Sequence, residues 1–285
     1  MTPVAAVDLG TNSTRLLIAG EREVRRTVVT GLGRGLTDTG RLSADGWAAT
    51  LRTLQGYRVL MEGAGVERAR AVMTAVGRQA SDTGEFLVEA ESTLGIRPEV
   101  ISGDEEARLS YRGAVADLDG EGWTVVDIGG GSTEIVGAGG GDSYDVGSVV
   151  TTDRYLSERP ASSDDVTAAR TWVSSMLRGH PPASAGVVGV AGTWTSLAGI
   201  TLGREPYDPN LVHHSTLDRV ALERWVECLG AMSFEDTARL AGLDPARAPV
   251  ILGGAVVAEA VASVLDVDNV VVSEHDLLDG IVSEL

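Results

Sequence analysis

The stretch DLGTNSTRL at residues 8–16 occurs again, in altered form, as DIGGGSTEI at residues 127–135. Both copies fit the pattern D-x-G-x-x-S-T-x-[L/I], and apolar residues typical of β-strands flank each copy. Each copy therefore predicts a β-hairpin closed by a tight turn of Gly, Ser and Asn. Two such hairpins, each opening one half of the chain, predict two similar halves that face each other across a cleft.

The rest of the chain divides in the same way. In the first half we expect strands at 24–30, 69–73 and 99–101, which alternate with helices at 44–61 and 86–94. A polar, glycine-bearing linker follows at 117–122. In the second half we expect four helices, at 166–177, 195–202, 222–232 and 250–265, and two strands, at 187–191 and 270–272. This mixture in two repeats predicts an α/β protein with domains at residues 1–121 and 122–285.

Composition excludes several kinds of chemistry. All 23 Lys+Arg residues are arginine, and with 41 Asp+Glu the net charge is -18. Without lysine there is neither a Walker-A loop nor a Schiff base, and the acidity disfavours nucleic acid as a partner. The single cysteine, Cys228, fits a reducing compartment, and the start of the chain does not read as a signal peptide, so we expect a cytoplasmic protein. The apolar stretch 248–265 contains Pro249 and Glu259, which indicates a buried helix and no membrane span.

The turns of the two hairpins are suited to phosphate. Successive backbone N–H groups in a Gly/Ser-rich turn form a concavity that binds anions without lysine. The turn residues are Gly10, Thr11, Asn12 and Ser13 in one hairpin and Gly129, Gly130, Gly131 and Ser132 in the other. Asp8 and Asp127 end the preceding strands, and opposed carboxylates beside a phosphate suit a hard divalent ion. The alternative is that each aspartate only caps its own turn.

Other candidate residues have two readings each. Glu105 and Glu106 stand in the first turn of a helix, where a carboxylate either favours the helix dipole or orients a water as a general base. Arg15 and Arg78 are either phosphate clamps or arginines with a solvated or structural role, and for any single arginine the second reading is favoured. The segment 186–192, a strand running into a helix start, either holds an anion or only packs.

Two further residue types predict no chemistry. The four histidines lack a metal-binding spacing, so a histidine–metal site is not expected; they are His180, His213, His214 and His275. Cys228 lies in an apolar helix, which favours a core position over a nucleophile. The chain also has no G-x-G-x-x-G, which disfavours a dinucleotide-binding fold.

Taken together, these stretches resemble the exopolyphosphatase/guanosine pentaphosphate phosphohydrolase (Ppx/GppA) family of the actin-like ATPase-fold superfamily. Besides the two hairpins, the resemblance rests on GLGRGLTDTGRLS (31–43), TAVGRQAS (74–81), ISGDEEARLSYRG (101–113), GSVV (147–150), VAGTWTSLA (190–198), RAPVILGGA (247–255) and SEHDLLDGI (273–281). It implies two actin-like (ribonuclease H-like) domains with the active site in the cleft between them, and it allows the last helix to pack back across the hinge.

The resemblance also implies an activity. A family member of this kind hydrolyses the terminal phosphoanhydride of inorganic polyphosphate, or of guanosine pentaphosphate as the alternative, with Mg²⁺ or Mn²⁺ held near Asp8 and Asp127. Glu106, directly before Ala-Arg in SGDEEAR, matches the family's catalytic base. Glu134 matches a second acidic residue, implicated in catalysis or metal positioning. Arg78 ends the family's T-x-x-x-R segment, and the two turns become its paired phosphate loops.

The chain departs from the family pattern in three places. Gly77 stands before Arg78 where relatives have a TSAVR type, and Pro249 stands where relatives carry Asp. The chain ends after the two actin-like domains, without the helical HD-like domain of longer relatives, which favours short polyphosphates. Relatives often dimerise, so the stretch 248–265 is expected either in the core or at a homodimer interface. Two rivals stay open: an ATP-binding actin-like or kinase-like protein, with nucleotide on 186–192, and a non-catalytic polyphosphate sensor.

Overall fold

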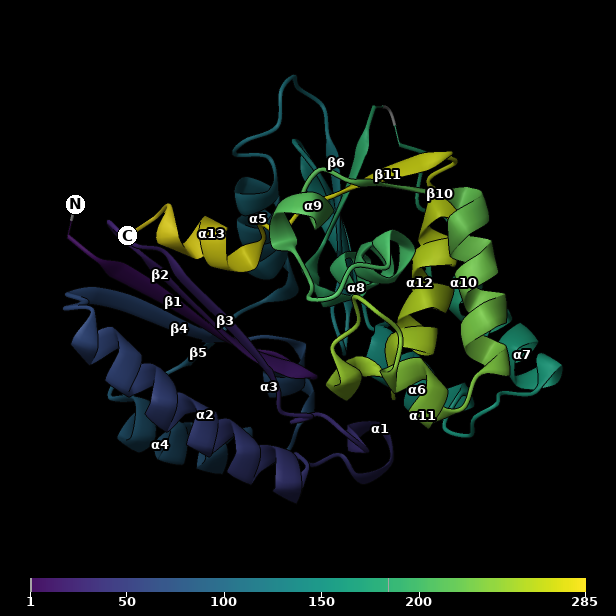
Figure 1. Ribbon diagram of the computed structural model, residues 1–285. Coiled ribbons are helices and arrows are strands. Elements are labelled where there is room, and N and C mark those ends of the chain that lie inside the picture. Colours follow the sequence, from purple (N-terminus) through teal and green to yellow (C-terminus); the bar gives the residue numbers. More distant parts are fainter. Residues whose placement is uncertain (1, 184) are drawn as a thin grey trace.

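Two β-sheets organise the computed structural model, which describes residues 2–183 and 185–285 (Figure 1). The first sheet consists of β1 (Val4–Leu9), β2 (Ser13–Ala19), β3 (Val24–Val29), β4 (Arg68–Met73) and β5 (Glu99–Val100). The second consists of β6 (Thr124–Ile128), β7 (Thr133–Gly137), β8 (Gly140–Tyr144), β9 (Val187–Val190), β10 (Thr216–Asp218) and β11 (Asn269–Val272). Both predicted hairpins are present, as β1–β2 and β6–β7.

The two sheets share one topology. The first has the order β3-β2-β1-β4-β5, with antiparallel pairs up to β1 and parallel pairs beyond it. The second runs β8-β7-β6-β9-β11 with the same succession of antiparallel and parallel pairs, and β10 adds one antiparallel strand at its edge. This repeat confirms the predicted α/β class and its two actin-like, ribonuclease H-like units.

Helices cover the outer faces of both sheets. On the first sheet, α2 (Ala44–Gly63) and α4 (Thr83–Leu94) bury an apolar face against the strands, and they lie below the sheet in Figure 1. The larger second core is built around α12 (Ile251–Val264), which packs on its neighbours α6 (Ser148–Tyr155), α7 (Ser163–Met176), α8 (Ala191–Leu202) and α10 (Arg219–Ala231). Eleven of the fourteen residues of α12 are buried, so the apolar stretch belongs to the core.

Two helices fill the space between the sheets. The helix α5 (Gly103–Ala114) packs on β6, β7 and β8, whereas α13 (Leu277–Val282), from the end of the chain, packs on β1 and β2. Their backbones touch: a Cβ at Gly113 would overlap the carbonyl oxygen of Asp276, and one at Gly280 would overlap that of Leu109. The contact between α5 and α13 therefore joins the two halves of the molecule, and it depends on glycine at both positions.

The sequence did not predict several short elements. These are α1 (Leu36–Thr39), α3 (Ala75–Gln79), α6, β8, α9 (Pro209–Val212), β10, α11 (Phe234–Ala238) and a 3-10 turn (Pro245–Arg247). The strand β8 has the sequence GGDSY, which carries little β-propensity of its own and pairs because β7 presents an edge. Within the described residues, the structure contains no helix that is both long and apolar enough to cross a membrane. The domain boundary at residue 121 stays a prediction.

Candidate active site

The turns of the two hairpins meet in the middle of the molecule. Each turn is closed by the same hydrogen bond, from Gly10 N–H to the Ser13 carbonyl and from Gly129 N–H to the Ser132 carbonyl, both 3.0 Å. The side chain of Thr11 lies against the second turn, where a Cβ at Gly130 would stand 2.9 Å from the Thr11 Cβ. Only glycine leaves room for this approach, so the sequence GGG makes the contact between the halves possible.

The packing around each turn leaves backbone donors unused. The carbonyls of Thr11 and Asn12 accept hydrogen bonds from the backbone of residues 30–33, and the carbonyl of Gly130 accepts from Val149 and Val150 at the start of α6. The N–H groups of Thr11, Asn12, Gly130 and Gly131, in contrast, have no acceptor in the part of the chain that the structure describes. Four free amides on two facing turns are donors of the kind that bind an anion, and anion binding by these turns stays a prediction.

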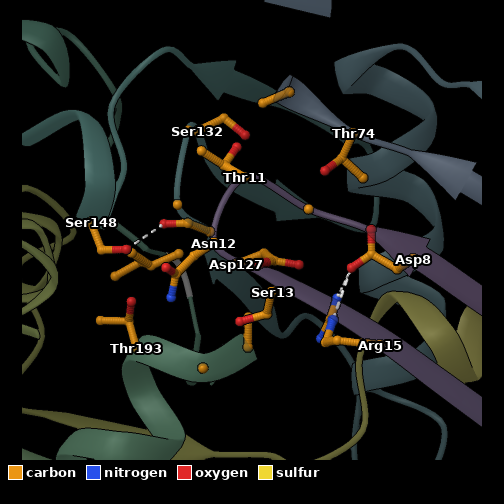
Figure 2. Close-up of a pocket in the computed structure, with 18 of the residues that line it drawn as sticks. Asp8, Thr11, Asn12, Ser13, Arg15, Thr74, Asp127, Ser132, Ser148 and Thr193 are labelled. Carbon is orange, nitrogen blue, oxygen red and sulfur yellow. Dashed lines mark hydrogen bonds and ion pairs between the residues drawn. The ribbon is translucent and has the colours of Figure 1, made fainter. Parts of the chain in front are cut away.

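A pocket with about 560 Å³ of empty volume opens between the turns (Figure 2). The predicted residues that line it are Asp8, Gly10, Thr11, Asn12, Ser13, Arg15, Glu106, Asp127, Gly129, Gly130, Gly131 and Ser132. The segment 186–192 also reaches it, because the first residues of α8, Ala191 to Thr193, form part of the wall. Arg78 and Glu134 are not among the lining residues within the described chain; they lie behind the wall and contact side chains that line it or adjoin it.

The structure distinguishes Glu106 from Glu105. Ser102 caps α5, and the first turn of the helix brings Glu106 into the pocket with 7% of its surface exposed. Its Oε2 accepts a hydrogen bond of 2.8 Å from Arg78, which also donates to the carbonyl of Ile101. Glu105 points elsewhere, to Arg70 at 2.6 Å. Burial raises the pKa of Glu106 to about 8, an effect that the Arg78 guanidinium opposes and the Asp127 carboxylate reinforces.

Two more carboxylates are buried beside Glu106. Asp127 accepts a hydrogen bond of 2.6 Å from Ser110, one helical turn after Glu106 on α5, and burial raises its pKa to about 6. Glu134 is fully buried and accepts a hydrogen bond of 2.7 Å from Ser143 on β8. Burial, with the charges of Glu106 and Asp127, raises the pKa of Glu134 well above its usual value. The group of acidic side chains thus favours a bound proton or a nearby cation.

Asp8 and Asp127 fit a hard divalent cation. Oδ2 of Asp8 accepts a hydrogen bond of 2.8 Å from Arg15 Nε and forms an ion pair of 2.7 Å with Arg15 Nη2, but its Oδ1 is buried and, among residues 2–183 and 185–285, has no partner. An unpaired buried carboxylate oxygen, in a pocket that a second carboxylate, Asp127, also lines, is suited to Mg²⁺ or Mn²⁺, which take one or two protein oxygens together with water and phosphate oxygens. The described residues place no third metal-ligating side chain close enough to complete a cage here.

Arg247 is a pocket residue that the sequence did not single out. Its guanidinium lies against Gly192, where a Cβ would overlap it, and it lines the pocket beside the start of α8. Across the two described ranges it forms neither a hydrogen bond nor an ion pair, and burial lowers its pKa. A cation without another partner on the wall of the pocket is available to an anionic ligand. The stretch RAPVILGGA begins at Arg247, but it does not predict that this side chain reaches the pocket, which depends on the packing of a 3-10 turn against α8.

Comparisons with known proteins show the family of this chain. A model of the Ppx/GppA phosphatase family matches residues 21–285. The chain belongs to the Ppx/GppA phosphatase family. Exopolyphosphatase 2 of Mycobacterium tuberculosis is 38% identical over 318 residues, with 100% of this chain and 99% of that protein covered. Among solved structures, an exopolyphosphatase-like protein superimposes with a TM-score of 0.93 at 31% identity, covering 99% of this chain and 97% of that one. A Ppx/GppA enzyme of Aquifex aeolicus gives 0.80 at 30%, covering 100% and 99%.

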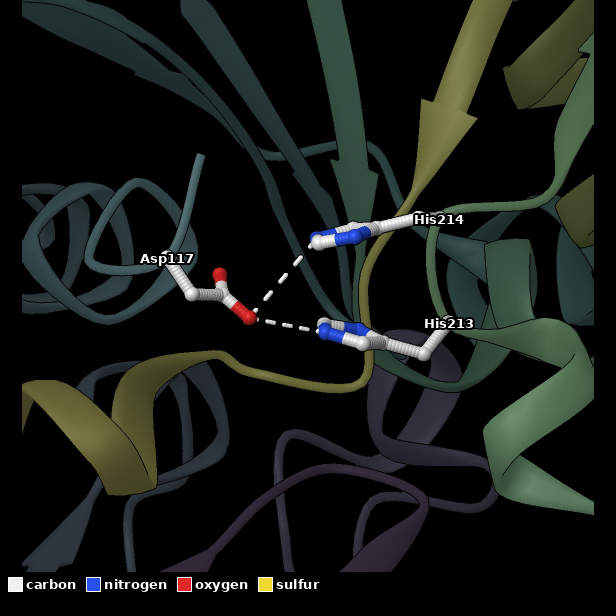
Figure 3. Close-up of side chains that lie close together, drawn as sticks. All are labelled: Asp117, His213 and His214. Carbon is white, nitrogen blue, oxygen red and sulfur yellow. Dashed lines mark hydrogen bonds and ion pairs between the residues drawn. The ribbon is translucent and has the colours of Figure 1, made fainter. Parts of the chain in front are cut away.

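This Ppx/GppA phosphatase also gathers three of its four histidines around Asp117, away from the pocket. Figure 3 shows Asp117 with two of them, His213 and His214. His213 and His214 stack with ring centroids 3.9 Å apart, and His213, His214 and His275 lie 2.8, 3.7 and 3.2 Å from Asp117. Sequence spacing did not predict this cluster, because its members come from three separate loops. Its hydrogen bonds do not favour a metal: Nδ1 of His213 accepts from the backbone N–H of Glu274, which leaves the ring proton on Nε2, where it is donated to Asp117.

Proposed function

We propose that this chain is an exopolyphosphatase, which hydrolyses the terminal phosphoanhydride bond of inorganic polyphosphate and releases orthophosphate. The observation that carries the proposal is one pocket that holds both a buried carboxylate, Glu106, and four unused backbone N–H groups. Membership of the family, and the 38% identity to a protein named exopolyphosphatase, support the same reaction.

The residues divide the work of the reaction. The N–H groups of the two turns hold the terminal phosphoryl group, and Arg15 and Arg247 donate to its oxygens. Glu106 orients a water and takes a proton from it as the water oxygen attacks phosphorus. The bond between phosphorus and the bridging oxygen breaks, so orthophosphate and a shorter chain leave. Positioning and charge stabilisation supply most of the acceleration.

The remaining residues prepare this site. Arg78 holds Glu106 by a 2.8 Å hydrogen bond, and Ser110 holds Asp127 from the same helix. Asp8 and Asp127, with Glu134 behind them, would hold Mg²⁺ or Mn²⁺. When bound, the ion neutralises negative charge on the phosphate oxygens. The Asp8 Oδ1, buried without a partner among the described residues, supports this assignment.

Hydrolysis of guanosine pentaphosphate is the second candidate. A cavity with about 870 Å³ of empty volume adjoins the phosphate pocket and shares Arg247 with it. Tyr207 and Glu274 line this cavity, and an aromatic ring with a carboxylate suits a nucleobase. Both substrates contain the same scissile bond, so the phosphate pocket serves either.

We also propose a cytoplasmic location, which the lone Cys228 supports because it fits a reducing compartment. We propose two domains divided after residue 121.

We further propose that the chain assembles as a homodimer. Light scattering coupled to size-exclusion chromatography would measure the molar mass and test this assembly.

Phosphate release from tripolyphosphate, long-chain polyphosphate and guanosine pentaphosphate, each with Mg²⁺, tests the proposed function. We expect the highest kcat/KM on a polyphosphate, and on tripolyphosphate over the long chain. A higher kcat/KM on guanosine pentaphosphate would establish the second candidate instead. Release from none of the three, with the protein folded, would reject both activities.

A further inference from the structure

The last helix of the chain reaches into the active site through one carboxylate. Asp276, the N-cap of α13, is 5% exposed, and its Oδ2 pairs with Nη1 of Arg15. Arg15 meanwhile donates from Nε to Asp8 at 2.8 Å, and its Nη2 lies 2.7 Å from the same carboxylate oxygen as an ion pair. The guanidinium of Arg15 is therefore held on two sides, by a residue of its own sheet and by a residue 261 positions later in the chain.

We infer that Asp276 is a positioning residue, which holds the Arg15 guanidinium in the orientation that receives the substrate phosphate. This inference rests on the proposed function, because it assigns to Arg15 a contact with phosphate. Asp276 itself does not line the phosphate pocket within the described chain; it acts through Arg15.

The number of donors on Arg15 supports this role. A guanidinium has five N–H groups. Two of them form hydrogen bonds, one with Asp276 and one with Asp8, and Nη2 also lies against the Asp8 carboxylate as an ion pair. Each terminal nitrogen keeps an N–H that forms no hydrogen bond within the described residues, and Arg15 lines the pocket. A guanidinium clamped on both sides loses little side-chain freedom when it binds a ligand, which is the benefit of preorganisation.

Asp276 is itself firmly placed. Its Oδ1 accepts from the N–H of Leu278 at 3.0 Å, and its own N–H donates to Asp279 at 2.8 Å, which completes a capping box. Asp279 forms two hydrogen bonds with Arg25 on β3, at 2.7 and 3.0 Å. The Asp276 carboxylate, which holds Arg15, is thus linked through Asp279 and Arg25 to the first sheet.

Two substitutions separate positioning from general support of α13. In D276N, the asparagine still caps the helix, but its side chain is neutral and no longer offers Arg15 a charged acceptor. E284Q is the control, since Glu284 follows α13 and pairs with Arg108 on α5, and it contacts neither Asp276 nor Arg15 within the described residues. We expect D276N to lower kcat/KM for phosphate release by about tenfold, mainly through KM, and E284Q to change it less than about twofold. Urea unfolding of both variants checks that their stabilities are comparable.

A double-mutant cycle with R15A tests whether Asp276 acts through Arg15. We expect D276N to have no further effect, within about twofold, once Arg15 is absent. The inference is wrong if D276N has no larger effect than E284Q in the wild-type background, or if its effect persists undiminished beside R15A. If the wild-type protein releases no phosphate, the proposed function fails. Calorimetric titration of tripolyphosphate with Mg²⁺ into wild type, D276N, R15A and the double variant then tests the positioning role of Asp276 by binding. An equal Kd for wild type and D276N would overturn that role.

Discussion

Asp127 on β6 and Glu134 on β7 are cross-strand partners, at the position where Asp8 on β1 faces Arg15 on β2. The two hairpins share their backbone pairing and their closing hydrogen bond, but they differ in charge at this one position. The first hairpin presents a carboxylate neutralised by a guanidinium, and the second presents two carboxylates. This difference divides the proposed work: phosphate binding through Arg15 on one side, and a cation-attracting, proton-holding group on the other.

Replacing Glu106 by glutamine should abolish most of the activity. Glutamine keeps the size of the side chain but cannot take a proton from water, so we expect kcat for phosphate release to fall by about 10²–10⁴. E105Q is the matched control, because Glu105 pairs with Arg70 outside the pocket, and it should retain near wild-type rates. Near wild-type release by folded E106Q would reject Glu106 as the base.

The pH profile should report the same carboxylate. A general base works deprotonated, and burial raises the pKa of Glu106 to about 8, so kcat/KM should rise with pH and level off above an inflection near that value. Bound Mg²⁺ favours the charged form and should lower the inflection. R78Q removes the cation that opposes the shift and should move the inflection upward by about one pH unit. R70Q is the control, because Arg70 pairs with the neighbouring Glu105, and it should leave the inflection unchanged. A lower inflection in R78Q would contradict the assignment of the inflection to Glu106.

Arg247 should bind substrate. Because its guanidinium has no other partner among the described residues and faces the pocket, R247A should raise KM for tripolyphosphate by about tenfold or more, with a smaller effect on stability. R247K should recover part of the loss, since lysine keeps the charge without the planar fork. R224A, on the exposed face of α10, is the control. An unchanged KM in R247A would place Arg247 outside the binding site.

Glycine at position 130 should be required for the two turns to meet. In G130A the new Cβ would stand 2.9 Å from the Thr11 Cβ and 3.1 Å from the Asn12 nitrogen, so one turn must move away. We expect kcat/KM to fall by at least about tenfold, because the four free N–H groups of the two turns then no longer point to the same phosphate group. The control is G84A, where the Cβ meets nothing within 4 Å. Full activity of G130A would show that the turns act independently.

The divalent cation should bind at Asp8 and Asp127. We expect Mg²⁺ to raise the Tm of the wild-type protein, since it stabilises the folded state to which it binds, and D8N to lose most of that increase. In D8N the uncharged amide also no longer neutralises Arg15, so its Tm without Mg²⁺ serves as the baseline. D142N, an exposed acidic residue on β8, is the control. An equal Mg²⁺ response in wild type and D8N would place the cation elsewhere.

Much of the fold was predictable because its signals are local. The hairpins at residues 8–16 and 127–135 follow from apolar strand residues around Gly, Ser and Asn, and the long helices follow from their apolar periodicity. The strand β8 was not predictable, since GGDSY becomes a strand only beside β7. Arg247 was missed for a similar reason, because its position depends on a 3-10 turn that packs against Gly192.

By itself, the sequence predicted that phosphate would be held by backbone turns, a metal ion and guanidinium groups, since the chain has no lysine and has two glycine-rich hairpins. It left open which carboxylate faces the pocket and which arginines are free. Tertiary structure alone settled those points: Glu106 lies inside and Glu105 outside, Arg78 is bound to Glu106, and Arg15 is held by a residue 261 positions away. The physical reason is that a strand or a turn is specified by neighbouring residues, whereas burial and charge pairing depend on contacts between segments that are distant in the chain.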